Sequence, residues 1–570
     1  MSRTWQRIVV GLVAVALVAA ATAQAGEAVV LGRVCVRDVK QLVDKATKVV
    51  DKIVPGQGAQ MKAMADMQLQ GAQFAGADWT RPFSIVLISG KGFGKVEPVP
   101  VGIIPVANGE QFRQARQAAG QVGEKIEIRG NYALISNDPG AFAAISEERI
   151  NIYSSFPKAG GDSDVYLTFY IDDTVKEYQI EIDQAMQQAQ EQVAGMGAAG
   201  GPFAMMGQIQ KALGPLAKFA ATQARRVSLI LKLTDDSLEV MGRFYAIEGS
   251  HLATALAGQP QKMTDLAKYL PPDACMSFVT MSDITKARPF AEALLDTIAA
   301  PLEMKTEDRD KVLALMFGST QTGEAAIAYS GDPTQKGMQM AQVIRIADAA
   351  KFRAASKDAV EWMMQGPLGG MMQGMGMNMD VKHEPGIREH KGVTIDRLTV
   401  TVKQDPNAQP NPMMGQQQPQ VTEMGALGDL GVAATNNPTG ELLNAIIDRI
   451  KGGEPGLDQS PAYKAALAAA PKNASIVYHV SFNTFLAKAL EEVAKQQPMI
   501  AMMAGGLAQA DPNEPPITGY AIFDGNRVEF FTRVPQQPII NLANRIRKMA
   551  EQRGGPGAAP GPKPGGVDDF

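Results

Sequence analysis

Five methionines in one Gly-rich stretch are the residues of this sequence best suited to hold a metal ion. They are Met371, Met372, Met375, Met377 and Met379. Thioether sulfur is a soft ligand that favours Cu(I), so periplasmic copper handling through Met-rich loops is one function that the sequence offers. Methionine is also a flexible filler of loops and adhesive surfaces, and the chain has 30 of them. We therefore assign no metal ligand and keep copper binding as an alternative.

The histidines add no recognisable metal site. His383 and His390 share the stretch KHEPGIREHKG, whereas His251 and His479 stand alone. The sequence contains no HExxH pair and no Cys/His set with zinc spacing. We expect His383 and His390 to be solvated residues of a hairpin, and we predict no metal and no cofactor.

The stretch SGKGFGKV, from Ser89 to Val96, resembles a phosphate loop only superficially. That loop needs four residues between its first Gly and the Gly-Lys pair, and then Ser or Thr. Here Gly90 and Gly94 enclose three residues, and Val96 follows Lys95. The stretch therefore predicts a hairpin turn.

Catalytic motifs are missing from the sequence. It has no GxSxG stretch and no kinase or dinucleotide fingerprint. Paired carboxylates such as Asp172–Asp173 and Asp235–Asp236 fall at expected turns and helix starts. They could act as an acid/base pair only if the fold brought them to a partner. We name no catalytic residue, and an enzyme of unrecognised, hydrolase-like type stays an alternative.

The first 25 residues have the pattern of a secretory signal peptide. Arg3 and Arg7 precede an apolar run from Ile8 to Ala21, and a small-x-small site ends at Ala25. About 14 apolar residues are fewer than the ~20 that a membrane-spanning helix needs. We expect cleavage after Ala25, no transmembrane anchor afterwards, and a periplasmic or extracellular protein.

Export gives the two cysteines two possible states. Cys35 and Cys275 would meet oxidising surroundings, in which they could form a disulfide. Cysteine is also often buried as a small hydrophobic residue, so two buried free thiols on strands are the other possibility.

Charge and composition limit the kinds of partner that the protein is expected to bind. The net charge is -4 and the basic residues are scattered, which does not suit nucleic acid. Of the 570 residues, 45% are hydrophobic, so we expect at least two domains. The sequence favours a non-catalytic binding or structural component of the cell envelope whose partner is an unknown envelope protein or polymer.

Four segments of the chain share one pattern, in which an apolar strand ends at Asp or Asn and an amphipathic helix follows. The junction residues are Asp38, Asp173, Asp283 and Asn483. A side-chain oxygen at this position can accept a hydrogen bond from a free helix N–H group. We predict that all four residues cap helices.

The order of the segments repeats along the chain. Residues 26–265 and 268–548 run through the same series of strands, hairpins and helices, and Phe112-Arg113 aligns with Phe352-Arg353. Alternating apolar and polar residues in the strands indicate antiparallel pairing. The sequence thus predicts an α+β fold of two similar tandem halves, each an antiparallel sheet with short helices packed on one face.

Two similar strand-to-helix turns, ISNDPG and ATNNPTG, show how the two halves align. We call these turns the two corners. In each, we expect a strand to end, Asp138 or Asn437 to cap a helix, and Pro139 or Pro438 to take the first helical position. The second half contains extra Met/Gly-rich and Gln/Pro-rich sequence, which we predict to be insertions at 365–380 and 404–427. Residues 551–570, rich in Gly and Pro, should form a disordered tail.

The segment from Leu457 to Phe482 resembles a recurrent segment of uncharacterised bacterial exported proteins, grouped as a domain of unknown function. The matching residues are Leu457, Pro461, Tyr463, Ala466, Leu467, Pro471 and Tyr478. The stretches NYALISNDPGAFAAI and GYAIFDGNRVEFF also look like parts of such proteins. The resemblance implies an exported α+β protein and carries no catalytic residue.

Overall fold

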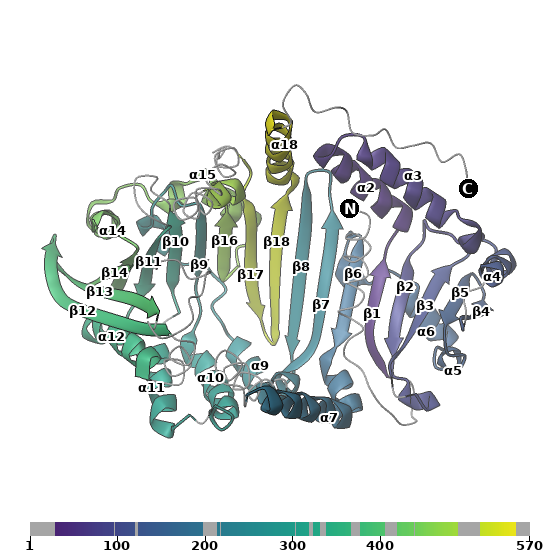
Figure 1. Ribbon diagram of the computed structural model, residues 1–570, viewed down its shortest axis with the longest axis horizontal. Coiled ribbons are helices and arrows are strands. Elements are labelled where there is room, and N and C mark those ends of the chain that lie inside the picture. The colour runs from purple at the N-terminus through teal and green to yellow at the C-terminus, as the bar shows by residue number, and fades with distance from the viewer. Residues whose placement is uncertain are drawn as a thin grey trace.

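A computed structural model describes most of the chain (Figure 1). The described residues are 29–95, 97–119, 123–197, 214–216, 218–302, 304–318, 323–330, 338–365, 377–404, 419–437, 439–487 and 514–553. The predicted signal peptide and the residues after 553 lie outside this part of the chain.

One antiparallel sheet of 18 strands crosses the whole width of the molecule in Figure 1. From one edge to the other the strands are β4 (Lys125–Arg129), β5 (Tyr132–Ser136), β3 (Val99–Pro105), β2 (Phe83–Ile88), β1 (Val30–Val36), β6 (Val165–Tyr170), β7 (Ala224–Leu233), β8 (Ser237–Ala246), β18 (Arg527–Pro535), β17 (Ile517–Asp524), β16 (Ile476–Val480), β9 (Met276–Thr280), β10 (Ala325–Ser330), β11 (Gln339–Arg345), β15 (Leu430–Thr435), β14 (Gln420–Leu427), β13 (Val393–Gln404) and β12 (Met377–His390).

The strands before residue 250 and those after residue 270 meet in the middle of this sheet. β8 pairs with β18 from Ser237↔Pro535 to Tyr245↔Arg527, and Met241 faces Phe531 at the centre of that register. The expected mixed α+β class and the antiparallel pairing are confirmed. The prediction of two separate sheets is wrong, because backbone hydrogen bonds between β8 and β18 join all the strands into one sheet.

Helices line both ends of the strands in Figure 1. They are α2 (Val39–Ile53), α3 (Gln57–Leu69), α4 (Gly109–Ala118), α5 (Gly140–Ala143), α6 (Glu147–Tyr153), α7 (Ile171–Gly197), α9 (His251–Leu256), α10 (Ile284–Ala299), α11 (Thr306–Phe317), α12 (Ala349–Gln365), α14 (Glu441–Gly452), α15 (Pro461–Ala469) and α18 (Gln536–Arg553), with a further helical stretch at 218–223. None of the helices in the described ranges is long and apolar enough to cross a membrane.

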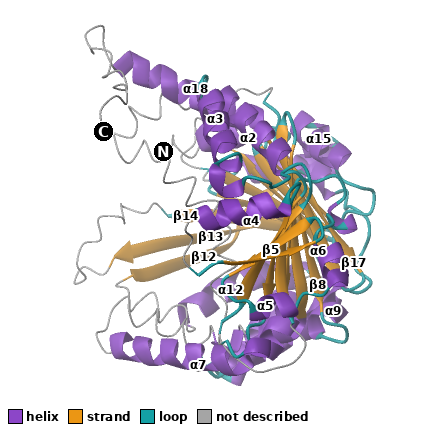
Figure 2. Cartoon of the chain, turned by 90° about the vertical axis from the view of Figure 1, so that its right-hand side faces the viewer, coloured by secondary structure: helices purple, strands orange, loops and turns teal. Residues whose placement is uncertain are grey.

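The helices pack on both faces of the sheet, which corrects the expected single face (Figure 2). Neighbouring residues of one strand point to opposite faces. Val86 of β2 packs with Phe142 of α5 and Ile150 of α6, whereas the adjacent Leu87 packs with Tyr178 of α7. The nearly unbroken apolar run of β2 is therefore buried on two sides.

Two of the four predicted helix caps form. The Asp38 carboxylate accepts a hydrogen bond from the Gln41 N–H at the start of α2, and Asp283 accepts one from the Thr285 N–H at the start of α10. Each strand here ends one or more residues before the helix begins, so the carboxylate has room to fold back over the first turn.

The other two predicted caps are wrong. α7 starts directly after β6, at Ile171, so Asp173 lies inside its first turn. Asn483 belongs to the helical residues 482–487, and its amide donates to Glu514 and to the Pro538 carbonyl oxygen, at 2.5 and 3.0 Å. Asn483 thus links two segments across the fold rather than capping a helix.

The two corners differ from each other in detail. Asp138 accepts a hydrogen bond from the Gly140 N–H at 2.8 Å, but Pro139 is the residue before the first helical residue rather than the first. At the second corner α14 begins after Gly440, the side chain of Asn437 reaches forward to Leu442, and Pro438 lies outside the described residues.

Parts of the predicted insertions and tail are regular structure. β12 begins within 365–380, and β14 occupies the end of 404–427. The buried Glu423 of β14 accepts hydrogen bonds from Arg388 of β12 and Arg397 of β13, which fixes this hairpin on the sheet. α18 continues to Arg553, so the helix extends into the predicted tail.

Near the centre of the sheet, aromatic side chains lie over glycines of neighbouring strands. Tyr478 of β16 reaches across Gly519 of β17, and its hydroxyl lies 2.5 Å from the Thr532 hydroxyl of β18. Phe530 of β18 lies in the same way over Gly242 of β8. The missing Cβ atoms make room for rings that bind adjacent strands together.

Replacing Gly519 with alanine is expected to lower the free energy of unfolding by about 1–3 kcal/mol. The new methyl group would lie 2.4 Å from the Phe531 carbonyl oxygen and 2.3 Å from the Tyr478 ring. Gly452→Ala is the matched control, because nothing lies within 4 Å of that position. Urea unfolding measures both variants, and equal losses of stability would contradict this packing.

Candidate functional site: a junction cleft and an apolar cavity

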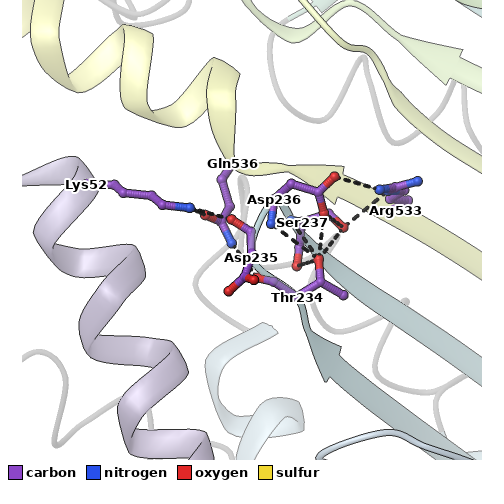
Figure 3. Close-up of polar contacts among 7 residues, drawn as sticks. All are labelled: Lys52, Thr234, Asp235, Asp236, Ser237, Arg533 and Gln536. Atoms are coloured by element: carbon purple, nitrogen blue, oxygen red, sulfur yellow. Dashed lines mark hydrogen bonds and ion pairs between the residues drawn. The ribbon is translucent and has the colours of Figure 1, made fainter.

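A cleft of about 590 Å³, the junction cleft, opens beside the central strand pair. Its lining comes from distant parts of the chain: Lys52, Asp235, Asp236, Ala465, Ala469, Pro515, Pro516, Thr518, Arg533, Pro535, Gln536, Gln537 and Ile540. Figure 3 shows several of its polar side chains together with Thr234 and Ser237 of the adjoining turn; they come from the end of α2, the β7–β8 turn, the end of β18 and the start of α18. Polar groups from before residue 250 and after residue 270 thus converge here.

The β7–β8 turn, TDDS, organises the polar groups of the junction cleft. Asp236 accepts hydrogen bonds from the hydroxyls of Thr234 and Ser237, at 2.7 and 3.1 Å. The Arg533 guanidinium donates to the Asp236 carboxylate at 2.9 Å and to the Ser237 hydroxyl at 3.1 Å (Figure 3). The hydrogen bond from Thr234, followed by those from Ser237 and the charge of Arg533, holds the pKa of Asp236 below its ordinary value.

The main chain of the same turn binds α2 and α18. Lys52 donates to the Asp235 carbonyl oxygen, and the Gln536 amide donates to the Thr234 carbonyl oxygen at 2.9 Å. The backbone N–H of Gln536 donates to the Asp236 carbonyl oxygen at 2.8 Å. The turn therefore fastens α2 and α18, the first and last helices among the described residues, to the sheet.

The chemistry available in the junction cleft is binding rather than proton transfer. A general base needs a pKa near the working pH and a free lone pair, whereas Asp236 is held ionised by Arg533 and two hydroxyls. The Ser237 hydroxyl is buried and donates to a carboxylate, and no histidine lines the cleft. The polar groups that converge here hold elements together and do not form a nucleophile with its base.

A smaller cleft of about 380 Å³, the counterpart cleft, lies at the other end of the central strands. It is lined by Tyr170, Asp172, Asp173, Arg225, Arg226, Tyr245 and Asn526. The Arg226 guanidinium lies 4.1 Å above the Tyr245 ring. Burial, and then the charge of Asp172, raises the pKa of Asp173. The charge of Arg225 opposes this rise, so the start of β7 and the start of α7 interact electrostatically across the cleft.

A cavity with a mostly apolar lining, the apolar cavity, has a volume of about 1080 Å³. It lies between α7, the helical stretch 218–223, β8, α9 and α10. Its apolar lining residues are Ile171, Val175, Ile182, Leu216, Phe219, Ala220, Ala221, Ala224, Phe244, Ile247, Leu252, Phe290 and Leu294. The rings of Phe219 and Phe290 are 5.4 Å apart and join the 218–223 stretch to α10.

Few polar groups face the apolar cavity, and they fall into two sets. The exposed Thr222 and the buried Gln223 are both hydrogen bonded to the protein itself. Asp172, Lys176, Gln179, Asp183 and Lys218 form the rim of the cavity. A large apolar volume with a few polar groups at one side is the usual form of a small-molecule binding site.

Neither cysteine forms a disulfide in the structure, and both side chains are buried. Cys35 lies in β1 and Cys275 directly before β9, with six strands between β1 and β9. At about 4.8 Å a strand they are roughly 30 Å apart, far beyond the ~7 Å between Cα atoms that a disulfide bridges. Of the two predicted states, the structure therefore favours two buried thiols over a disulfide.

We expect about two thiols per chain to react with 5,5′-dithiobis(2-nitrobenzoate) once the protein is unfolded without reductant. In the folded protein the reaction should be slow, because both side chains are buried and burial raises the pKa of Cys35. The absorbance of the thiolate that the reagent releases measures the number of reactive thiols and their rate of reaction. Unfolded protein with no reactive thiol would show that the cysteines pair.

In the part of the chain that the structure describes, no group of three or more His, Cys, Asp or Glu side chains could hold a metal ion. His383 and His390 both lie on β12 of the β12–β13 hairpin, as expected, and His390 Nε2 is 2.7 Å from Asp448. Met377 and Met379 also lie on β12, whereas residues 371, 372 and 375 fall outside the described ranges.

The SGKGFGKV stretch joins the antiparallel strands β2 and β3, so the predicted hairpin is confirmed. Lys91 within it is buried, with its ammonium 3.4 Å from a carboxylate oxygen of Glu181 on α7. The lysine fastens the hairpin to α7 and does not face an anion site.

His479 is a buried histidine of β16 with a defined hydrogen-bond pattern. Its Nε2 lies 3.2 Å from the Ala274 carbonyl oxygen, which can only accept, so Nε2 carries the proton. Nδ1 then accepts from the Ser277 hydroxyl at 2.7 Å. Burial lowers the pKa of this neutral imidazole.

Acid is therefore expected to destabilise the fold through His479. The unfolded chain takes up this proton near pH 6.5, and the folded chain only at lower pH, so the unfolding free energy falls as the pH drops below about 6.5. His479→Gln keeps a donor for Ala274 but cannot be protonated. Urea unfolding from pH 7.5 to 4.5 should give a shallower pH dependence for this variant, and parallel curves would contradict the prediction.

Comparison of the chain with protein-family models, with characterised proteins and with solved structures finds no significant match. The residues that carry the resemblance to exported proteins have a packing role here, since Leu457, Tyr463 and Ala466 are buried in the largest core cluster. The resemblance itself stays a prediction.

Sequence reasoning identified the TDDS turn but missed its partners Arg533 and Gln536. These residues reach the turn only through the pairing of β8 with β18, between residues far apart in the chain. One signal was present: Glu239 and Arg243 have the same spacing as Glu529 and Arg533. The Arg243 guanidinium pairs with the Glu529 carboxylate at 2.7 Å. Arg533 lies opposite Glu239 in the strand register, but its guanidinium bonds to the TDDS turn instead.

Proposed function

We propose that this chain is an exported, non-catalytic binding protein of the cell envelope that holds a hydrophobic ligand in the apolar cavity. The observation that carries the proposal is the cavity itself, with about 1080 Å³ bounded by thirteen apolar side chains. Burial of apolar surface is the main source of affinity in such sites, at about 25 cal/mol per Å². Export rests on the predicted signal segment, residues 1–25.

The absence of a reacting constellation in the described clefts supports a binding role. In the junction cleft the Arg533–Asp236 ion pair and the β7–β8 turn use the polar groups, and in the counterpart cleft Arg226 stacks on Tyr245. The apolar cavity offers hydrophobic contact to a ligand, and its four charged lining residues form two ion pairs, Lys176–Asp172 and Lys218–Asp183.

A tandem duplication accounts for the architecture, and we propose it as the origin of the two halves. Read inward from the edges, the order β4-β5-β3-β2-β1-β6-β7-β8 corresponds to β14-β15-β11-β10-β9-β16-β17-β18, with β12 and β13 as an added hairpin. The central pair supports this further, because Met241 faces Phe531 (531 − 241 = 290) and the same shift relates Glu239 to Glu529 and Arg243 to Arg533.

The apolar cavity depends on contact between the two proposed halves. α7, β8 and α9 belong to the first half, whereas Phe290 and Leu294 of α10 belong to the second. α9 and α10 pack together at the end of the central strands, so the wall is complete only in the full chain.

Binding can be tested with the fluorescent probe N-phenyl-1-naphthylamine and the chain from residue 26 onward. We expect saturable fluorescence enhancement in the wild type. Val175→Trp places a large ring on the inner wall and should weaken probe binding by about ten-fold, which corresponds to the 1–3 kcal/mol of an overfilled site.

Ile180→Trp is the matched control on the same helix. Ile180 is 65% exposed and does not line the apolar cavity, so the same kind of substitution there should leave probe affinity unchanged. No saturable enhancement in the wild type, or equal loss in both variants, would refute the cavity as the binding site.

A further inference from the structure

We infer that the ligand of the apolar cavity is a long-chain amphiphile whose head group has no net charge, either uncharged or zwitterionic. The inference rests on the proposed binding function and adds the chemical class of the ligand. It follows from two features of the cavity, namely a lining that is mostly apolar and charged lining residues that pair with one another.

The two uncharged polar side chains of the 218–223 stretch that line the cavity are bonded to the protein itself. The Thr222 hydroxyl donates to the Phe219 carbonyl oxygen at 2.8 Å and accepts from the Gln223 amide at 3.0 Å. The Gln223 amide oxygen accepts from the Leu252 N–H at 3.1 Å, and Gln223 is buried. A polar group of a ligand placed against this wall would lose its hydrogen bonds to water, at a cost of about 1–3 kcal/mol. The part of the ligand inside the cavity must therefore be apolar.

The rim is where the polar part of a ligand can stay hydrated. Along α7, the apolar residues Ile171, Val175 and Ile182 face the cavity one position before the polar residues Asp172, Lys176 and Asp183. This places an apolar stripe next to a polar stripe on the same helix. An amphiphile would insert its chain along the first stripe and leave its head group at the second.

The charges at the rim cancel in pairs. Lys176 lies 3.4 Å from Asp172, and Lys218 lies 2.8 Å from Asp183. A charged head group would find one attractive and one repulsive partner in each pair, so it would gain little from the rim. A zwitterion can oppose both signs at once, and an uncharged head group can bond to the exposed Gln179 amide between the two pairs.

The test uses displacement of N-phenyl-1-naphthylamine by four surfactants with the same dodecyl chain, each below its critical micelle concentration. They are dodecyl maltoside, dodecylphosphocholine, dodecyl sulfate and dodecyltrimethylammonium. We expect the first two to displace the probe at about three-fold lower concentration than the last two, since exposed ion pairs are worth about 0.2–1 kcal/mol.

Rim variants should change this ranking in opposite directions. Lys218→Glu makes the rim acidic and should favour the ammonium surfactant, whereas Asp183→Lys makes it basic and should favour dodecyl sulfate. Lys62→Glu is the control, because Lys62 pairs with Asp44 away from the cavity.

The outcomes separate the two proposals. Probe binding without the expected ranking, or rim variants that leave the ranking unchanged, would overturn the head-group inference and leave the cavity as a hydrophobic site. No probe binding at all would overturn the proposed function as well.

Discussion

The pairing of β8 with β18 is the contact on which the rest of the structure depends. It places residues almost 300 positions apart in register, and the TDDS turn, Arg533 and Gln536 meet only because of it. The same pairing sets α9 against α10 at one end of the strands and α18 against α2 at the other. Backbone hydrogen bonds define this register, and the aromatic rings over Gly242 and Gly519 reinforce it from one face.

The junction cleft and the apolar cavity both lie beside the β8–β18 strand pair, and they differ because their lining side chains differ. At the junction cleft a carboxylate, two hydroxyls and a guanidinium satisfy one another, so the polar groups stabilise the fold. At the apolar cavity the wall residues are mostly aliphatic or aromatic, and the few polar atoms are bonded within the wall. Apolar surface that the fold does not fill with its own side chains is available to a ligand, whereas paired charges are not.

The sequence predicted local features well and long-range ones poorly. The helix after Asp38 and the hairpin at SGKGFGKV follow from periodicity and turn chemistry within a few residues. The cap at Asp173 fails because β6 runs into α7 without a break, which no local pattern reveals. The unbroken apolar run of β2 did carry the information that helices cover both faces. The apolar cavity, in contrast, depends on which faces of α7, α9 and α10 remain uncovered after packing, and this is a property of the assembled chain.

The central strands also bear on how such a chain can exist in solution. Without residues 268–548, β8 would be an outer strand with a free row of N–H and C=O groups, flanked by the exposed Leu238. Free strand edges of this kind pair with whatever strand is available, including one from another copy. In the full chain β18 covers that edge permanently. Because β8 and β18 belong to one chain, this pairing needs no association between molecules, and it forms at any concentration.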